Sequence, residues 1–291
     1  MARVSVIIPT YNFGRFIGAA IESARAQTLT PDEIIVIDDG STDDTEDVVR
    51  GFDGVEYIRQ ENAGVCAARN RGVEASAGEL VAFLDADDVW EPTKVEKQVA
   101  IFNKDPQVGL VHCGMREFAH ETGETIAMHL NGADGWMADN LLLWDGPVIV
   151  GPGGTIMVRR DVYDEMGGFD TRQKVGEDWD LCYRIARKYK VGFVPEPLVN
   201  YRSHPGAAHH NVREMERGMG LFYKKAFADP DPHVQSLKGR SYSNYHRVLA
   251  GSYFASADYP SFLRHTLLSL RHQPSQIGYF LQFPLRRFSK R

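Results

Sequence analysis

The sequence predicts an α/β fold, with a mostly parallel β-sheet flanked by helices and a helical region at the C-terminal end. Two observations lead to this prediction. Short apolar runs alternate with helical patterns through the first hundred residues, at the spacing of strand–helix–strand units. Two of these runs, ending at Asp38 and at Leu84, continue directly into acidic turns. In open α/β sheets, ligands bind at the carboxyl ends of the strands, so these turns are candidate ligand sites.

The expected strands of the first half are short runs of β-branched and apolar residues, and the expected helices carry apolar residues on one face. The strands are expected at Val4–Ile8, Glu33–Asp38, Val55–Arg59 and Leu80–Leu84. The helices are expected at Phe13–Gln27, between Ser41 and Arg50, and at Val65–Ala75. This alternation implies parallel strands joined by right-handed crossovers.

The second half is expected to continue the pattern less regularly. Helices are expected at Thr93–Asn103, at Arg160–Met166 and from Glu177 to about Lys188, and strands near Val108–His112, Gly153–Val158 and Val191–Val194. Residues 113–150 are expected to form an irregular region that receives the acceptor, and Tyr201–Asn211 a polar loop. A helical pattern runs from Glu214 to the end, which predicts one domain over residues 1–210 and a helical region over 211–291.

The composition is typical of a soluble globular protein, with 43% hydrophobic and 25% charged residues among 291. The net charge of −6 argues against general nucleic-acid binding. Cys66, Cys113 and Cys182 have no Cys-x-x-Cys spacing, which indicates free thiols and neither a zinc site nor a disulfide framework. No apolar run approaches the ~18 residues of a membrane span, and residues 1–11 are too short for a signal peptide. These features predict a cytoplasmic protein.

The acidic turn after Leu84 holds three carboxylates in four positions: Asp85, Asp87 and Asp88. Because unpaired charges are not tolerated inside a buried strand, we expect them to emerge at its end. A divalent cation would relieve their repulsion, and oxygen ligands suit Mg²⁺ or Mn²⁺ better than zinc. The alternative is an ordinary turn, since aspartates are common after strands and before helices.

Four motifs occur in one order: Val4–Asn12 (VSVIIPTYN), Asp38-Asp39-Gly40-Ser41, Asp85-Ala86-Asp87-Asp88 and Gly176-Glu177-Asp178. In order and spacing, this set resembles the family 2 inverting glycosyltransferases of the GT-A fold. The resemblance covers roughly Val4–His204, and the last third of the chain carries no motif of the family. It implies a GT-A-like, Rossmann-like sheet, a nucleotide-diphosphate sugar as donor, and an acceptor hydroxyl that replaces the nucleotide.

The resemblance also implies a nucleotide site formed by Pro9, Thr10, Tyr11, Asp39, Arg69, Asp85 and Ala86. In that site Tyr11 lies against the base, Asp38 supports the turn, and Asp39 accepts a hydrogen bond from a uracil-like N3–H. A carboxylate accepts from an N–H that cytosine lacks, which favours a UDP-linked donor. Arg69 reaches the base or the diphosphate, and Asp85 contacts the ribose. The residues alone also fit two structural roles in place of nucleotide binding. Tyr11 is then an aromatic residue at the edge of the core, and Arg69 lies on a solvated face of its helix.

For the reaction itself, the resemblance implies Mn²⁺ or Mg²⁺ held by Asp87 and Asp88, with His204 as a further ligand. Asp178 matches the catalytic base of the family, with Glu177 beside it, and a single base implies inversion at the anomeric carbon. Alternatives again come from ordinary structure. Acidic residues are favoured in the first turn of a helix, and His204 is otherwise a loop histidine like His209 and His210.

The C-terminal segment Ile277–Leu285 is aromatic and apolar, and Arg286, Arg287, Lys290 and Arg291 follow it. This pattern is typical of an interfacial membrane anchor, and also of a terminal helix docked on its own domain. The family resemblance implies a saccharide or lipid-linked saccharide acceptor, used in the synthesis of surface polysaccharide or glycoconjugates. The expected location is the cytoplasm, with peripheral contact at the inner face of the membrane.

Three other functions fit the sequence less well. A sugar-nucleotide pyrophosphorylase needs a glycine-rich phosphate loop after its first strand, where this chain has Thr10–Gly14 (TYNFG). An NAD-dependent enzyme is disfavoured because no Gly-x-Gly-x-x-Gly follows any strand. A non-catalytic nucleotide-sugar-binding or scaffold protein is the third, and Asp87 and Asp178 argue against it.

Overall fold

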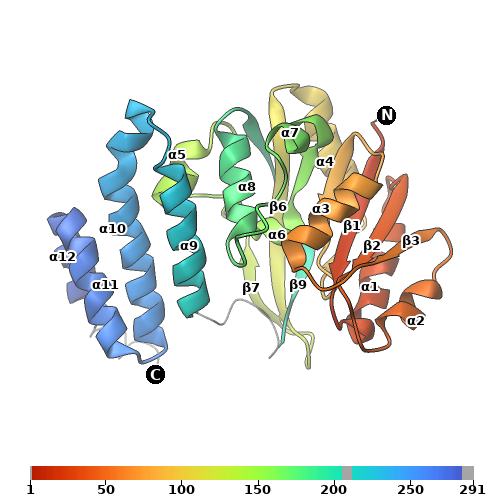
Figure 1. The fold of residues 1–291 in the computed structure, drawn as a ribbon, viewed down its shortest axis with the longest axis horizontal. Helices are drawn as coiled ribbons and strands as arrows, with labels where there is room; N and C mark the ends of the chain where they lie inside the picture. Colours follow the sequence, from red (N-terminus) through yellow and green to blue (C-terminus); the bar gives the residue numbers. More distant parts are fainter. Residues whose placement is uncertain (1, 205–211, 284–291) are drawn as a thin grey trace. The chain divides into compact units, whose positions relative to one another are not determined.

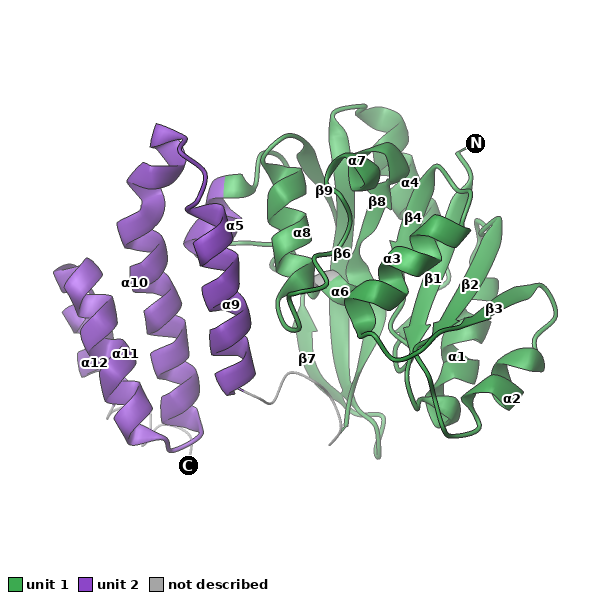
Figure 2. Cartoon of the chain, viewed as in Figure 1, with its two compact units in different colours: residues 1–138, 147–207 green, residues 139–146, 208–291 purple. Residues whose placement is uncertain are grey.

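The computed structural model describes residues 2–204 and 212–283, and these form two compact units (Figures 1 and 2). An α/β unit contains residues 1–138 and 147–207, and a helical unit contains 139–146 and 208–291. The α/β class and the helical C-terminal region are confirmed. The boundary expected between residues 210 and 211 falls outside the described residues. Residues 139–146, expected within the first domain, belong to the helical unit.

The first half of the sheet is parallel, as expected. β1 (Val4–Thr10) lies between β2 (Glu33–Asp38) and β4 (Leu80–Phe83), and β3 (Val55–Arg59) pairs with β2. Val6 is the register partner of Ile34 on β2 and of Ala82 on β4. The carboxyl ends of β1, β2 and β4 therefore meet at one edge of the sheet.

The second half makes the sheet mixed, where a mostly parallel one was expected. β8 (Met157–Arg159) runs antiparallel to β4 and to β6 (Val108–Ala119), and β6 runs parallel to β9 (Lys190–Ser203). Two further strands are antiparallel additions: β5 (Val89–Trp90) pairs with β9, and β7 (Thr125–His129) pairs with β6. Residues 113–150 therefore contain the extension of β6, β7 and a short helix, which the sequence pattern did not reveal.

Two expected strands differ from the structure. The strand expected at Gly153–Val158 begins only at Met157, because α6 (Pro152–Thr155) precedes it. Thr155 closes this helical turn, since its Oγ1 donates to the backbone oxygens of Val150 and Gly151. The strand expected at Val191–Val194 continues to Ser203, through shifts in its register with β6. Tyr201–Ser203 thus belongs to β9, and residues 205–211 of the expected loop, His209 and His210 among them, lie outside the described residues.

Helices flank the sheet of the α/β unit (Figure 1). They are α1 (Gly14–Arg25), α2 (Thr45–Arg50), α3 (Val65–Ala75), α4 (Lys94–Lys104), α7 (Arg160–Glu165) and α8 (Glu177–Ala186). Val6 and Ile8 of β1 pack with Ile17 and Ile21 of α1 in one buried cluster. The buried face of α1 is the apolar face that the sequence pattern indicates. Cys66, Cys113 and Cys182 are free and buried.

The helical unit consists of α5 (Ala138–Leu143), α9 (Val212–Ala226), α10 (Pro232–Ala255), α11 (Tyr259–His272), the 3₁₀ turn η2 (Pro274–Gln276) and α12 (Ile277–Leu281). Tyr223 of α9 is fully buried and packs against Tyr245 of α10. Asn244 Nδ2 donates to the backbone oxygen of Leu143 at 2.9 Å and so ties α5 to α10. Within residues 2–204 and 212–283, no helix combines the length and apolar character that crossing a membrane requires.

Candidate active site

The loops after β1 and β2 are tied together at the carboxyl edge of the sheet. The Asp39 N–H donates to the Thr10 backbone oxygen at 2.9 Å, and the Asn12 N–H donates to Ser41 Oγ at 2.8 Å. Asn12 has a φ of 59°, a left-handed conformation that asparagine tolerates better than most residues. Pro9 and Thr10 are buried at the end of β1, while the next residue, Tyr11, is 46% exposed. The Tyr11 ring is therefore accessible beside a rigid loop.

Asp38 and Asp39 are both buried and hold the surrounding turns. Asp38 Oδ1 accepts from the Ser41 N–H at 2.7 Å, which fits the supporting role expected of it. Asp39 accepts three hydrogen bonds: from Gln60 Nε2 at 2.7 Å and from the backbone N–H groups of Ala63 and Gly64 at 2.8 Å each. A carboxylate has about four acceptor positions, so one position on Asp39 is left for a ligand.

Arg69 of α3 bridges two acidic motifs. Its side chain is 4% exposed, Nη2 donates to Asp85 Oδ1 at 2.8 Å, and Nη1 donates to Glu177 Oε1 at 3.0 Å. Burial opposes the charge of Arg69, but the two carboxylates raise its pKa above the ordinary value. The structure therefore excludes the solvated helix face as the role of Arg69 and joins the end of β4 to the start of α8.

Asp178 and Glu177 form the first turn of α8. Asp178 Oδ1 accepts a 2.6 Å hydrogen bond from the Trp179 N–H. Burial, together with the neighbouring Glu177 charge, raises the pKa of Asp178 to about 7, although Arg69 acts in the opposite direction. A carboxyl group with this pKa can accept a proton near neutral pH.

Gly153 of α6 lies between the acidic groups, and no sequence motif indicates it. A Cβ placed on Gly153 would lie 2.9 Å from Asp85 Oδ2, 3.3 Å from Arg69 Nη2 and 3.7 Å from Asp178 Oδ2. A Cβ on Gly154 would lie 3.3 Å from Asp88 Oδ2. The two glycines thus let the backbone approach the carboxylates closely, and they place Asp85 and Asp178 around one point.

Asp87 pairs with His204, although the two residues are 117 positions apart. His204 Nε2 lies 2.9 Å from Asp87 Oδ2, and the His204 ring is buried against Phe13 and Phe16 at centroid distances of 6.2 and 5.3 Å. Burial and the Asp85 charge raise the pKa of Asp87, while the His204 hydrogen bond opposes the shift. His204 is therefore held in place beside the acidic turn.

Asp88 is 1% exposed and holds the end of β9. Its Oδ1 accepts from the Arg202 N–H at 2.9 Å, and Arg202 Nε donates to the Asp87 backbone oxygen at 2.7 Å. Burial and the charges of Asp85 and Asp87 raise the pKa of Asp88 well above its ordinary value. Ala86 is buried within the same turn. Sequence reasoning missed Arg202, whose only signal was its place two residues before His204.

The side chains of the acidic turn include oxygen and nitrogen donors for a hard divalent cation. Among residues 2–204 and 212–283, no three His, Cys, Asp or Glu side chains are arranged to enclose a metal ion. Asp87 and His204, however, present an oxygen and a nitrogen donor side by side. Mg²⁺ and Mn²⁺ sites in nucleotide-using enzymes take one or two protein ligands and complete the shell with phosphate oxygens and water. The pair fits a cation of that kind.

A network of buried polar side chains hydrogen-bonds to the backbone of α6, and no sequence motif indicates it. Trp90 Nε1 donates to the Gly154 backbone oxygen at 3.3 Å, and Gln98 Nε2 donates to the Thr155 backbone oxygen at 2.8 Å. Lys94 is fully buried, donates to Gln98 Oε1 at 2.9 Å and lies 3.8 Å from the centre of the Trp90 ring. The only sequence signal was a lysine and a glutamine four residues apart on the inner face of a helix.

Comparisons with known proteins point to one family. The sequence model of glycosyl transferase family 2 matches residues 5–167. An uncharacterized glycosyltransferase from Nostoc sp. is 33% identical over 215 residues, which are 72% of this chain and 66% of that protein. The fold resembles that of two glycosyltransferases of known structure.

The first of these structures is S. aureus TarS 1-349 in complex with UDP, with a TM-score of 0.65 at 17% identity over 86% of this chain and 72% of that one. The second is the mannosyltransferase PcManGT from Pyrobaculum calidifontis in complex with GDP-Man and Mn²⁺. It gives a TM-score of 0.65 at 20% identity over 99% of this chain and 83% of that one. At these identities the likeness establishes the fold, which is of the GT-A type.

Proposed function

The chain belongs to glycosyl transferase family 2, and on that basis we propose that it moves a sugar from a nucleotide-diphosphate sugar to an acceptor hydroxyl in one inverting displacement. One observation carries the proposal. The buried guanidinium of Arg69 joins Asp85, in the acidic turn after β4, to Glu177. Glu177 is the neighbour of Asp178, whose carboxyl group has a pKa of about 7. Donor and base would then act within one site.

The nucleotide would bind across the ends of β1 and β2. Tyr11 offers an exposed ring to stack on a base, and Asp39 keeps one acceptor position for an N–H. Thr10 Oγ1 and Arg69 Nε are buried and have no hydrogen-bond partner among the described residues, as expected of groups that await a ligand. We propose UDP as the nucleotide, as bound to TarS, and GDP, as in the mannosyltransferase complex, is the competing outcome.

Asp87 and His204 would hold Mn²⁺ or Mg²⁺, with Asp88 fixing the Arg202–His204 segment in place. When bound, the cation would neutralise charge on the leaving diphosphate. The Mn²⁺ in the mannosyltransferase complex supports this assignment. Arg69, with its charge already balanced by Asp85 and Glu177, would keep the carboxylates oriented around the donor.

Asp178 would accept the proton of the attacking hydroxyl. The pKa of about 7 lets it stay ionised above neutral pH and still be a strong enough base to assist the attack. One base and one in-line attack give inversion, through a transition state with oxocarbenium character. Glu177 would be a positioning residue: its Oε1 is held by Arg69, and its charge helps to raise the pKa of Asp178.

We further propose a saccharide or lipid-linked saccharide as acceptor, in the synthesis of surface polysaccharide or glycoconjugates, with the chain acting at the inner face of the membrane. The support for membrane contact is the aromatic and basic C-terminal segment. Residues 284–291, which carry its basic cluster, lie outside the described residues. The proposed acceptor follows from family membership and from this segment together.

Calorimetric titration of UDP, dTDP, GDP and CMP, each with Mn²⁺ and with EDTA, tests the donor half. We expect UDP to bind in Mn²⁺, to bind at least about tenfold more weakly in EDTA, and to lose its metal dependence in Asp87→Ala. Asp53→Ala, at an exposed position away from the site, is the matched control. If GDP binds best, the role of Asp39 in base choice is overturned. If no nucleotide binds to the folded protein, the proposed donor site is overturned.

Asp178→Asn tests the chemical step separately. We expect this variant to bind the nucleotide as the wild type does and to lose donor-sugar transfer and hydrolysis. A non-catalytic nucleotide-sugar-binding protein would show no turnover in either form.

A further inference from the structure

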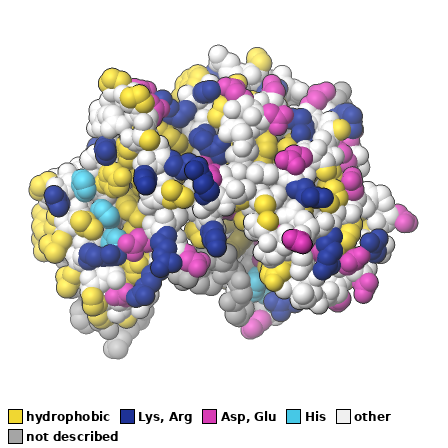
Figure 3. Space-filling view, in the orientation of Figure 1, with side chains coloured by type: hydrophobic (Ala, Val, Ile, Leu, Met, Phe, Trp, Pro, Cys, Tyr) yellow, Lys and Arg dark blue, Asp and Glu magenta, His cyan; other side chains and the backbone are white. Residues whose placement is uncertain are grey.

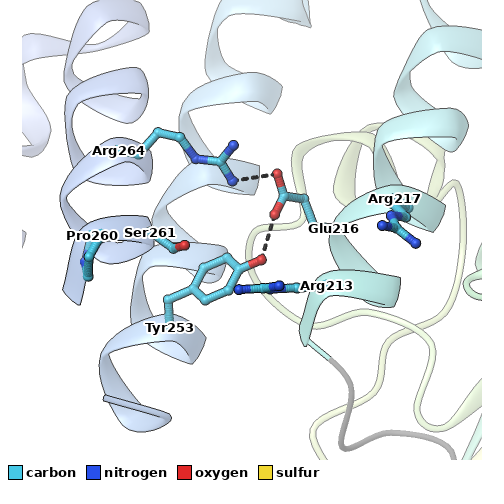
Figure 4. A pocket seen from close by; sticks show the side chains of 7 residues that line it. All are labelled: Arg213, Glu216, Arg217, Tyr253, Pro260, Ser261 and Arg264. Carbon is cyan, nitrogen blue, oxygen red and sulfur yellow. Dashed lines mark hydrogen bonds and ion pairs between the residues drawn. The ribbon is translucent and has the colours of Figure 1, made fainter. Parts of the chain in front are cut away.

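The helical unit contains a cavity of about 470 Å³ between α9, α10 and α11 (Figure 4). Among residues 2–204 and 212–283, those that line it all belong to this unit: Arg213, Glu216, Arg217, Tyr253, Pro260, Ser261 and Arg264. Three of the seven are arginines and one is acidic. Figure 3 shows lysine and arginine side chains, in dark blue, close together on this face of the helical unit. The cavity therefore has a cationic lining.

Glu216 is the carboxylate among the described lining residues, and it is already paired. Glu216 Oε1 accepts from Arg264 Nη2 at 2.8 Å, and Oε2 accepts from the Tyr253 hydroxyl at 2.6 Å. Burial disfavours the ionised form of Glu216, but the Tyr253 hydrogen bond and the charges of His265 and Arg264 lower its pKa below the ordinary value. Glu216 thus balances Arg264 and leaves the other two guanidinium groups uncompensated within the lining.

Arg213 and Arg217 are exposed and stand one helical turn apart on α9 (Figure 4). Arg213 Nη2 lies 3.7 Å from Asp258 Oδ2, a long ion pair between an exposed and a partly exposed side chain, which is weak. Arg217 has no hydrogen bond or ion pair within residues 2–204 and 212–283. Like charges at positions i and i+4 of a helix repel each other, and an anion between them would convert this repulsion into attraction.

We propose that this cavity binds a phosphate group, as a phosphomonoester or a diphosphate, through the guanidinium groups of Arg213 and Arg217. Guanidinium groups donate pairs of parallel hydrogen bonds to phosphate oxygens, and such charge-assisted bonds are among the stronger ones in proteins. The Tyr253 and Ser261 hydroxyl groups of the same lining donate to Glu216 and Asp258, so the two guanidinium groups carry the proposed binding. The lining residues that the structure describes all belong to the helical unit, so the proposal does not rest on the donor site or on the proposed reaction.

Binding of inorganic pyrophosphate to the full chain, measured by calorimetry in EDTA at low ionic strength, tests the proposal. We expect the double variant Arg213→Gln/Arg217→Gln to bind roughly tenfold or more weakly, a loss of about 1.4 kcal/mol or more in binding free energy, because it removes the charge-assisted bonds of both guanidinium groups. Arg240→Gln is the matched control, since Arg240 is a similarly exposed arginine of the same unit outside the cavity. Unchanged far-UV circular dichroism and melting temperature establish that the variants are folded.

A second arm distinguishes the source of the phosphate group. Cosedimentation is measured with phosphatidylcholine vesicles, with and without phosphatidic acid, for the same three proteins. Loss of pyrophosphate binding in the double variant supports a site that takes free phosphate groups. Loss confined to the phosphatidic acid vesicles supports a site that takes a phosphate carried on a lipid. If both measurements are the same in the double variant, in Arg240→Gln and in the wild type, the proposal is overturned.

Discussion

Arg69 Nη2 and Asp85 Oδ1 lie 2.8 Å apart, and the same guanidinium reaches Glu177, 108 residues further along the chain, at 3.0 Å. Arg69 is 3% exposed, so this bridge lies in an environment where an unpaired charge is costly. The bridge makes the acidic turn after β4 and the first turn of α8 interdependent. A change at Arg69 should therefore affect both turns at once.

Replacing Arg69 by Met should destabilise the fold by roughly 3–5 kcal/mol, because it leaves two partly buried carboxylates without their counterion. Arg69→Lys keeps the charge but lacks the planar fork that reaches two carboxylates, so an intermediate loss is expected. Urea unfolding at pH 7 measures both. Arg71→Met, at an exposed position of the same helix, should stay within about 0.5 kcal/mol of the wild type. Equal effects at Arg69 and Arg71 would contradict the bridge.

Gly153→Ala should impair catalysis more than it impairs stability. The new methyl group would lie 2.9 Å from Asp85 Oδ2 and 3.3 Å from Arg69 Nη2, so the carboxylate must shift. A misplacement of this size in a site that depends on orientation can lower kcat by about 100-fold. Steady-state kinetics with the donor found by the titrations above measure it. Gly239→Ala, in an open part of α10, should keep full activity and gain about 0.5–1 kcal/mol of stability.

His204→Ala should weaken the Mn²⁺-dependent part of nucleotide binding by about tenfold or more, because it removes a donor held 2.9 Å from Asp87. The comparison is the ratio of nucleotide affinity in Mn²⁺ to that in EDTA, measured by calorimetry. His129→Ala replaces a half-exposed histidine of β7 and should leave the ratio unchanged. If the ratio in His204→Ala equals that of the wild type, His204 only packs against Phe13 and Phe16.

Local patterns predicted much of the fold. The bounds of β2, β3 and α3 agree with the expected ones, because each element is a short run set off by turn residues. The convergence of the turns after β1, β2 and β4 also followed from sequence, since parallel neighbours end at the same edge of a sheet. These elements needed no information beyond neighbouring residues.

Contacts distant in sequence were harder to predict. Gly153-Gly154-Thr155 precedes an apolar run, and this pattern predicts a strand, yet in the structure these residues form a helical turn whose backbone lies close to the carboxylates. Arg69 had the pattern of a surface residue, and only the fold brings two carboxylates to it. β9 continues past Pro197 because its pairing with β6 tolerates a shifted register. Such features depend on contacts with residues far away in the sequence, which a pattern of neighbouring residues does not contain.

Lys94→Met should change the dependence of stability on pH. Burial lowers the pKa of Lys94 from 10.5 to about 8, so between these values the unfolded chain binds a proton that the folded protein does not. Wild-type stability should therefore rise from pH 8 toward pH 10.5 relative to the variant, by up to about 3 kcal/mol. Urea unfolding across this range measures the difference. Lys97→Met, a partly exposed position of the same helix, should show no such trend, and a constant difference for Lys94→Met would contradict the buried charge.

As the proposed base, Asp178 should link catalysis and stability through one titration. Its pKa is raised from 3.8 to about 7, so the folded protein holds a proton between these values that the unfolded chain has released. The contribution of Asp178 to stability must then fall as the pH rises from about 4 to 7 and stay low above it. Asp178→Asn lacks this loss, and its stability relative to the wild type should increase by a few kcal/mol over that range.

The same titration should appear in the kinetics with the opposite sign: activity should rise with pH where the contribution of Asp178 to stability falls. A base must be ionised to accept a proton, so wild-type kcat/KM should rise with pH up to about 7 and then level off. The condition that activates the enzyme is thus the one in which Asp178 destabilises it most, as expected where a catalytic group is held in an unfavourable environment. Glu22→Gln, at an exposed position of α1, should alter neither profile. A kcat/KM that is independent of pH between 5 and 8, together with unchanged stability of Asp178→Asn, would remove Asp178 as the base.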